Sequence, residues 1–555
     1  MRKRLLIPAA FIIFLFTACQ AQEAYVDTTL ALNNMAFELA DASNMTVHNF
    51  NLGFVELTTP EGYENTVAPI RGIISLPNTN NAPHPMVVIL HGRGGFYGEE
   101  NLSYAGFDYL VAQLAAQGFV ALSISVSGTF DNSWLAMHDF GVFHDLEQRW
   151  MVEIFEAHLH YLTQANAGQD VGHGIDLAAL LNFYEIHLIG HSRSGALVDS
   201  LARADIKQSS GRIASLIRLN PLVFDHDTPH PDLPISILLS EFDDDFPDHP
   251  GQSVFDDILI RGNHQSLASV VYLIGGNHNF ANRYFEEDDR ERAFFTLAHE
   301  SEERWITREE QEYFILHYVA SFLDVVTGRR DPWGIFNPSE PQPVSMFGFD
   351  VIASTYSGTA VSIFSANERQ ARGKLEATEH TQSPIRYGNP HFFIHPITYA
   401  HRNGLELLSL IWRDYDAKIT FVPTQNNFSE HQALSIYASV DSSNEINPTG
   451  QSQGFTVSLK DESGASKRVV IPSGVSALIF HPGMVFELPE FDESLSADIM
   501  RENDFHPWQG SMPLAEIRIP LSHFSDIDLS SIVEIGIYFD QTPSGAVMLW
   551  EMFLK

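Results

Sequence analysis

The chain has 555 residues, a length that predicts two or three domains rather than one ordinary core. Its hydrophobic content of 44% is typical of globular proteins, while 70 acidic residues against 32 basic ones give a net charge of −38. Because a surface this acidic repels phosphate backbones, the composition argues against nucleic acid as a partner.

The first residues have the pattern of an export signal. A basic run at residues 2–4 precedes the apolar stretch Leu5–Phe16, which is too short to span a bilayer comfortably. The stretch Leu15–Gln20 resembles a bacterial lipobox, and its Cys19 is the only cysteine of the chain, so it has no disulfide partner. We therefore predict a lipoprotein signal over residues 1–19 and an exported protein. A lipid on Cys19 would be the only membrane anchor of the protein. In a two-membrane bacterium we expect this anchor in the outer membrane. Without the lipid the protein would be secreted.

The next part of the chain reads first as a leader and then as strands alternating with helices. Residues 20–51 are predicted to be a helix-forming leader. The predicted strands are Phe54–Leu57, Ile70–Leu76, Met86–Leu90, Phe119–Ile124, Ile186–Ile189, Ile213–Leu219, Ile235–Leu239 and Val270–Leu273. The predicted helices include Tyr104–Gln117, Leu146–Leu162, Glu286–Glu303 and Arg308–Val326. Fully apolar strands that alternate with helices indicate an α/β domain over 52–327, a mostly parallel sheet with helices on both faces.

Beyond this domain the helical periodicity largely disappears. The stretch 328–344 is rich in proline and glycine and is predicted to be a linker. Short alternating segments separated by turn clusters fill 345–555. This pattern is typical of an all-β, jelly-roll-like sandwich, which we expect to be an accessory domain.

A strand, a tight turn and a helix surround Ser192. The apolar run Ile186–Ile189 leads into Gly190-His191-Ser192-Arg193-Ser194-Gly195, after which helical spacing begins. Such a turn presents its central serine as a nucleophile when small residues flank it. Gly190 meets this need, and Ser194 stands where a second glycine is usual. By itself the string also fits a helix-initiating turn.

An acid and a histidine follow the serine in the order that a hydrolytic triad on such a sheet requires. Asp243 and Asp245 lie in the loop after one predicted strand, and His278 lies after the next. Because loops after parallel strands open at one rim of the sheet, these side chains are expected to converge. The offset of Asp243 from its strand favours it as the acid, with Asp245 as the alternative.

A glycine-rich loop, His91-Gly92-Arg93-Gly94-Gly95, follows the strand Met86–Leu90. Such a loop can turn a backbone N–H toward a substrate carbonyl, so the expected oxyanion donors are the N–H groups of Arg93 and Arg193. We expect His91 to fix this loop. Residues expected to line the substrate pocket are Phe96, Tyr97, Trp134 and His191.

These motifs resemble the serine esterases and lipases of the α/β-hydrolase superfamily. The turn around Ser192 is similar to the Gly-His-Ser-Arg-Gly-Gly elbow of polyester-hydrolase and chlorophyllase-like members, residues 91–95 resemble the oxyanion motif, and residues 276–280 resemble the histidine loop. The resemblance implies hydrolysis of carboxylic esters by Ser192, Asp243 and His278 through an acyl-enzyme, without a metal or an organic cofactor. The substrate would be an ester of unspecified acyl and alcohol parts.

Two other functions stay open at this point. The segment 345–555 resembles the jelly roll of carbohydrate-binding modules in general pattern, so the enzyme could be a carbohydrate esterase that the segment targets to polysaccharide. A catalytically inactive surface protein with a binding or adhesion role is the third reading.

Overall fold

The computed structural model describes residues 28–59, 66–79, 81–94, 101–133, 140–223, 228–246, 249–289, 304–366, 378–385, 405–441, 444, 446–448, 450–481, 485–487, 508–510 and 513–555. The predicted signal with Cys19 therefore lies outside the described residues, as do Phe96, Tyr97, Trp134 and most of the predicted helix Glu286–Glu303. In the part that is described, no helix has the length and apolar character needed to cross a membrane.

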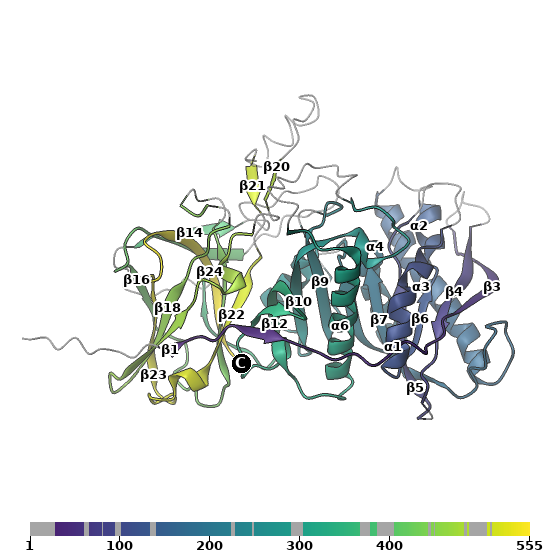
Figure 1. The fold of residues 1–555 in the computed structure, drawn as a ribbon, viewed down its shortest axis with the longest axis horizontal. Helices are drawn as coiled ribbons and strands as arrows, with labels where there is room; N and C mark the ends of the chain where they lie inside the picture. The colour runs from purple at the N-terminus through teal and green to yellow at the C-terminus, as the bar shows by residue number, and fades with distance from the viewer. Residues whose placement is uncertain are drawn as a thin grey trace, which may run out of the picture.

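Eleven of the described strands form one large sheet (Figure 1). In spatial order they are β2 (Asn33–Met35), β11 (Pro343–Met346), β12 (Phe349–Tyr356), β10 (Ala268–Asn277), β9 (Ile235–Phe242), β8 (Ile213–Leu219), β7 (Leu181–His191), β5 (His84–Leu90), β6 (Val120–Ile124), β4 (Val67–Ser75) and β3 (His48–Glu56). The six strands from β10 to β6 run parallel to their neighbours. β12 pairs antiparallel with β10, and β4 pairs antiparallel with β6 and with β3. The sheet is therefore parallel at its centre and mixed as a whole.

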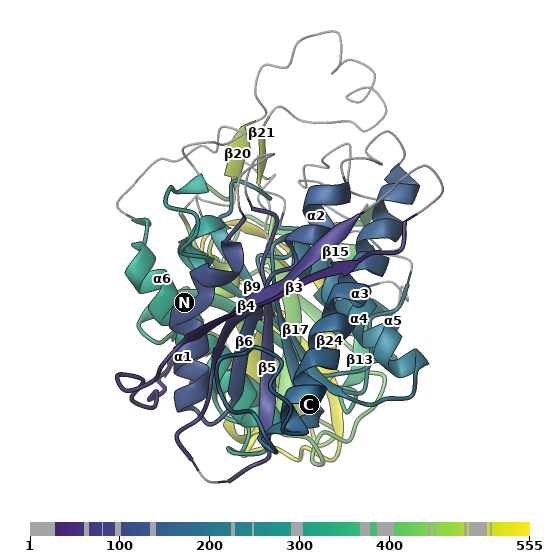
Figure 2. The same ribbon diagram turned by 90° about the vertical axis from the view of Figure 1, so that its right-hand side faces the viewer.

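The helices bury their apolar sides against this sheet. They are α1 (Asp108–Ala116), α2 (Ser127–Ser133), α3 (Phe140–Asn166), α4 (Arg193–Lys207), α5 (Gln252–Arg261) and α6 (Arg308–Val326). Val87 and Ile89 of β5 share a hydrophobic cluster with α1 and α6, while Val88 and Leu90 share another with α3, α4 and α5. Figure 2 shows these two groups of helices apart from one another, with the strands between them.

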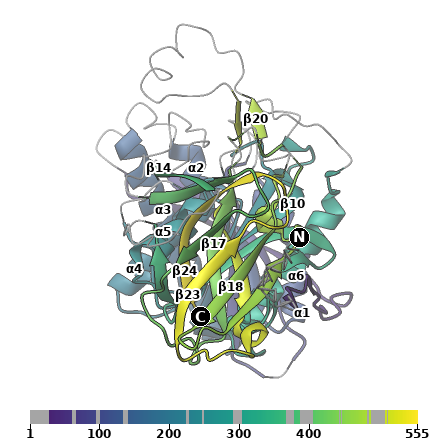
Figure 3. The same ribbon diagram turned by 90° about the vertical axis from the view of Figure 1, so that its left-hand side faces the viewer.

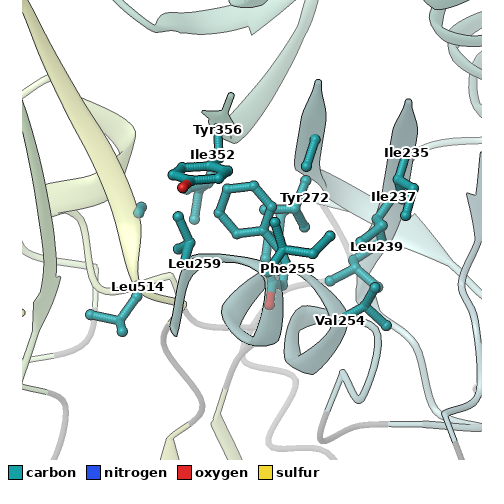
Figure 4. Packing of buried hydrophobic residues seen from close by; sticks show 14 of the residues in the cluster. Ile235, Ile237, Leu239, Val254, Phe255, Leu259, Tyr272, Ile352, Tyr356 and Leu514 are labelled. Carbon is teal, nitrogen blue, oxygen red and sulfur yellow. The ribbon is translucent and has the colours of Figure 1, made fainter. Parts of the chain in front are cut away.

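Two local observations illustrate why these segments become helices. Thr307 begins α6 with a capping box, in which its hydroxyl accepts from the N–H of Glu310 and the Glu310 carboxylate accepts from the N–H of Thr307. In α5, the apolar side chains Phe255 and Leu259 lie one turn apart and pack toward Tyr272 of β10 and Ile352 of β12 (Figure 4).

Two further sheets occupy the C-terminal part (Figure 3). One contains β1 (Thr28–Thr29), β19 (Ser466–Ile471), β18 (Phe455–Asp461), β23 (Ile532–Tyr538) and β16 (Lys418–Phe421). The other contains β14 (Thr378–Ile385), β15 (Leu405–Trp412), β24 (Gly545–Leu554), β17 (Ala433–Val440) and β22 (Ala515–Pro520), with β13 (Val361–Ser365) paired to β24. A separate pair joins β20 (Val485–Glu487) and β21 (Trp508–Gly510). Trp412 of β15 stacks on Phe539, which follows β23, at 4.3 Å between ring centres, and side chains of these five- and six-stranded sheets share one hydrophobic cluster.

A buried polar network joins the six-stranded sheet to the edge of the large sheet. Glu516 of β22 accepts from the N–H of Thr355 in β12 at 2.9 Å and from Lys555 Nζ at 2.7 Å. Arg518 donates to the carbonyls of Gly334 and Ile335. Residues 334 and 335 belong to the predicted linker, which is thus held by side chains of the accessory segment.

The predicted fold class was wrong for the chain as a whole. In place of a mostly parallel α/β-hydrolase sheet followed by a separate jelly-roll-like sandwich, the structure is sheet-rich, with 35% strand against 24% helix and a mixed eleven-stranded sheet. The prediction found the apolar central strands and parts of β3 and β4 at one edge, but it missed β2, β11 and β12 at the other edge, which come from distant parts of the chain. β11 and β12, from the predicted linker and sandwich, extend the large sheet.

The predicted helical leader was also wrong. Between residues 28 and 51 the structure has β1, β2 and the start of β3. β1 pairs with β19 and β2 pairs with β11, so this segment runs along both parts of the molecule (Figure 1). Pairing with these distant strands outweighs the helix propensity of the segment, so its residues become strands.

Candidate active site

Ser192 stands at the turn between β7 and α4. Its φ of 56° and ψ of −123° are sterically costly for an L residue, as in a strained strand-to-helix elbow. A Cβ on Gly190 would lie 2.6 Å from the carbonyl oxygen of Ser194, so only glycine fits there. Ser194 itself is buried, and its hydroxyl donates to the carbonyl of His91 at 2.6 Å. The departure from a second glycine therefore ties the elbow to the loop after β5.

The loop after β5 lies directly against the candidate nucleophile. A Cβ on Gly92 would be 2.6 Å from Ser192 Cβ and 3.2 Å from Ser192 Oγ. Burial lowers the pKa of His91 to about 4, so its ring is neutral. His91 Nε2 accepts from the N–H of Val126 at 3.0 Å and Nδ1 donates to the carbonyl of Gly92 at 2.6 Å. These two bonds hold Gly92, and with it Arg93, next to Ser192.

Asp243 and His278 form a buried pair. Nδ1 of His278 lies 3.0 Å from each carboxylate oxygen of Asp243, and the two side chains are 3% and 2% exposed. Asp245 lies on the other side of the ring, with Oδ2 3.4 Å from Nε2, and its side chain is 49% exposed. Asp243 thus occupies the position of a triad acid, while Asp245 faces the nitrogen that would serve the serine.

The charges around His278 favour its protonated form. Burial alone would lower the pKa of His278, but Asp243 and Asp245 outweigh burial and raise it to about 10. Within the described residues the hydroxyl of Ser192 makes no hydrogen bond, so the bond from Ser192 to Nε2 is not closed in this structure. Such catalytic bonds often tighten only when substrate binds.

Several bonds fix the loop that carries His278. Gln311 of α6 accepts from the N–H of Asn277 at 2.9 Å and donates to its carbonyl at 2.7 Å, and Asn220 donates to the same carbonyl at 3.1 Å. His191, the residue before the candidate nucleophile, has Nε2 3.2 Å from the carbonyl of His278 and its ring centre 5.0 Å from that of His278. His191 was expected in the pocket wall; the structure places it between the elbow and the histidine loop.

Three acidic residues near this site escaped the sequence reasoning. Glu147 of α3 is fully buried, and its carboxylate lies 3.0 Å from Nε of Arg193. Arg193 is the residue that directly follows the candidate nucleophile Ser192. Glu241 at the end of β9 is also buried and accepts from the N–H of Gly275 at 2.9 Å. Asp289 accepts from backbone N–H groups of both the acid loop and the histidine loop. Asp289 is the last residue of the acidic run 286–289 and is the buried one among the four. The sequence pattern does not indicate which of these four residues is buried.

Arg93 and Arg193 directly follow Gly92 and Ser192 in the chain, and because Gly92 lies against Ser192, both backbones pass close to the candidate nucleophile. Among the described residues, no group of three or more His, Cys, Asp or Glu side chains is arranged to hold a metal ion.

No protein-family model matches the chain, and no curated protein matches it significantly.

Proposed function

We propose that the protein is an exported serine hydrolase that cleaves carboxylic esters through Ser192, His278 and Asp243. The observation that carries the proposal is the buried His278–Asp243 pair, with both distances at 3.0 Å, together with a serine in a strained elbow whose neighbour His191 contacts the carbonyl of His278. A strained residue persists only where the surrounding structure enforces it, and such residues gather at functional sites.

The reactive form is the one in which His278 has lost its Nε2 proton, and its population grows as the pH rises toward the pKa of about 10. In this form Ser192 Oγ attacks the ester carbonyl while Nε2 of His278 takes the hydroxyl proton. Asp243 keeps the ring proton on Nδ1 and stabilises the charged imidazole. The tetrahedral intermediate expels the alcohol, which receives the proton from Nε2, and the acyl group stays on Ser192. Water then attacks the acyl-enzyme with the same base, and the acid leaves.

The backbone N–H groups of Arg193 and Arg93 are the proposed donors to the oxyanion. Arg193 begins α4, and the N-terminus of a 15-residue helix favours negative charge. The Glu147 carboxylate holds the Arg193 side chain, so this residue has little freedom to move. Loss of one oxyanion donor typically costs about 10²- to 10³-fold in rate.

The test is hydrolysis of a short-chain nitrophenyl ester by the full chain and by Ser192→Ala. Wild type should turn over the ester and react with a fluorophosphonate probe, while Ser192→Ala should do neither. Ser200→Ala, on the same helix and away from the elbow, is the matched control and should keep wild-type turnover. Retained turnover in Ser192→Ala would refute the proposal.

A further inference from the structure

Asp289 connects the two loops that carry the acid and the base. Its Oδ2 accepts from the N–H of Asp244 at 2.8 Å, and Asp244 follows Asp243 in the chain. Its Oδ1 accepts from the N–H of His278 at 3.1 Å and from that of Asn279 at 3.3 Å. One carboxylate thus bonds to the neighbour of the acid and to the backbone of the base.

A carboxylate in this place needs an explanation, because burial of charge is costly unless hydrogen bonds compensate. Asp289 is 7% exposed. Burial and the negative charge of Asp243 raise the pKa of Asp289 to about 7, because both make ionisation of Asp289 less favourable. Three backbone donors offset part of this cost, and all three belong to the loops of the candidate pair.

The other brace between these loops does not replace Asp289. Glu241 joins the ends of β9 and β10 by accepting from the N–H of Gly275 and pairing with Arg304 at 2.8 Å. It acts where the strands end, whereas Asp289 acts beyond them, at the residues that carry the chemistry. Without Asp289, the two loops would keep the direct Asp243–His278 contact and the bonds of Asn220 to Ser240 and Asn277, but they would lose the link that Asp289 makes between their backbones beyond the strand ends.

We propose that Asp289 is a positioning residue that sets the geometry of the Asp243–His278 pair. This inference rests on the proposed function, since it concerns the same pair. Asp289 acts through the backbone and touches neither the substrate nor the reacting atoms. A displacement of about 1 Å in a catalytic group can cost on the order of 10²-fold in rate. Loss of the three bonds of Asp289 would therefore lower the rate if it let Asp243 and His278 shift by a distance of this order.

The proposal also implies an electrostatic effect on the base. The titratable groups that face His278 are Asp243, Asp245, Asp289 and His191. Because the negative charge of Asp289 favours the protonated ring, its removal should move the acid limb of the pH profile of kcat/KM to lower pH. A residue that merely stabilised the fold would leave this limb in place.

The experiment compares Asp289→Asn with Glu286→Gln, which removes an exposed carboxylate from the same acidic run. In Asp289→Asn, kcat for the nitrophenyl ester should fall by roughly 10- to 100-fold with KM nearly unchanged, and the acid limb should move to lower pH. Glu286→Gln should behave as wild type. Equal kcat and equal pH profiles in the two variants would overturn the proposal.

Two further arms make the result decisive. If Asp289→Asn does not fold, Asp289→Glu decides: it keeps the charge but shifts the carboxylate, so we expect lower kcat with an unchanged acid limb, and wild-type kcat would overturn the inference. If wild type and Ser192→Ala hydrolyse esters equally, the proposed function fails instead. The His278 Nδ1 proton, read by its downfield NMR resonance, then tests positioning without substrate; its loss in Asp289→Asn supports the inference and its retention refutes it.

Discussion

Replacing Asp243 and Asp245 by asparagine, one at a time, tests which acid serves His278. Asp243→Asn removes a charge that is 2% exposed and whose two oxygens both lie 3.0 Å from Nδ1. The asparagine amide can donate to Nδ1, which leaves the ring proton on Nε2 and prevents the ring from accepting the proton of Ser192. We expect kcat to fall by roughly 10³- to 10⁴-fold, or about 4–5.5 kcal/mol of transition-state stabilisation.

Asp245→Asn should act mainly on the pH profile. Its side chain is 49% exposed and its Oδ2 lies 3.4 Å from Nε2 of His278. Because solvent screens the half-exposed Asp245 carboxylate, we expect its interaction with His278 to contribute about 1 kcal/mol or less, so kcat should change by less than about fivefold. Because Asp245 raises the pKa of His278, its loss should move the acid limb of kcat/KM to lower pH, by at most about 0.7 units.

The assay for both variants is steady-state hydrolysis of a short-chain nitrophenyl ester across the acid and alkaline range, with Ser192→Ala as the blank. Thermal unfolding shows whether each variant keeps its fold. The reasoning is refuted if Asp245→Asn loses more activity than Asp243→Asn, or if Asp243→Asn retains wild-type kcat.

Three other substitutions test the packing and the charges. Gly92→Ala should lower kcat by roughly 10²-fold, because its Cβ would lie 2.6 Å from that of Ser192; wild-type kcat in a folded variant would contradict the close approach. The pKa of His278 is raised on folding, so the stability from its charged form is present below its unfolded pKa and lost as the pH rises through about 10. The thermal midpoint of wild type minus that of His278→Gln should therefore be larger at about pH 6 than at about pH 10, and a constant difference would argue against the ion pair. Lys555→Met removes the cation that is paired at 2.7 Å with the buried Glu516 carboxylate and should cost about 3–5 kcal/mol of unfolding free energy in chemical denaturation. Lys467→Met removes an exposed ion pair and should cost about 1 kcal/mol or less of unfolding free energy. Similar losses of unfolding free energy in the two variants would contradict the expected difference between a buried and an exposed ion pair.

The central strands were predictable from local pattern. The runs Met86–Leu90 and Ile235–Leu239 are buried throughout in β5 and β9, because strands covered on both faces need no polar alternation. The predicted helix Arg308–Val326 coincides with α6, whose start a local capping box specifies.

The edge of the large sheet that β2, β11 and β12 form was not predictable in this way. β2 pairs with β11, with Asn33 opposite Pro343. β12 pairs with β10, with Ser354 opposite Val270. Both pairings join residues that are far apart in the chain. Periodicity describes which face of a strand is apolar, but it does not say which distant strand will become its neighbour. The mixed, sheet-rich architecture therefore emerged only from long-range pairing.

By itself the sequence determined the order of the candidate site: a serine in a tight turn, then acids, then a histidine, each after an apolar strand. Strand ends of a parallel sheet share one rim, so this order already implies proximity. Only the tertiary structure decided that Asp243 faces Nδ1 of His278, that Asp245 lies on the opposite side, and that Asp289 bonds to both loops. These choices depend on the direction and burial of side chains in loops from different strands, and packing of those loops sets both.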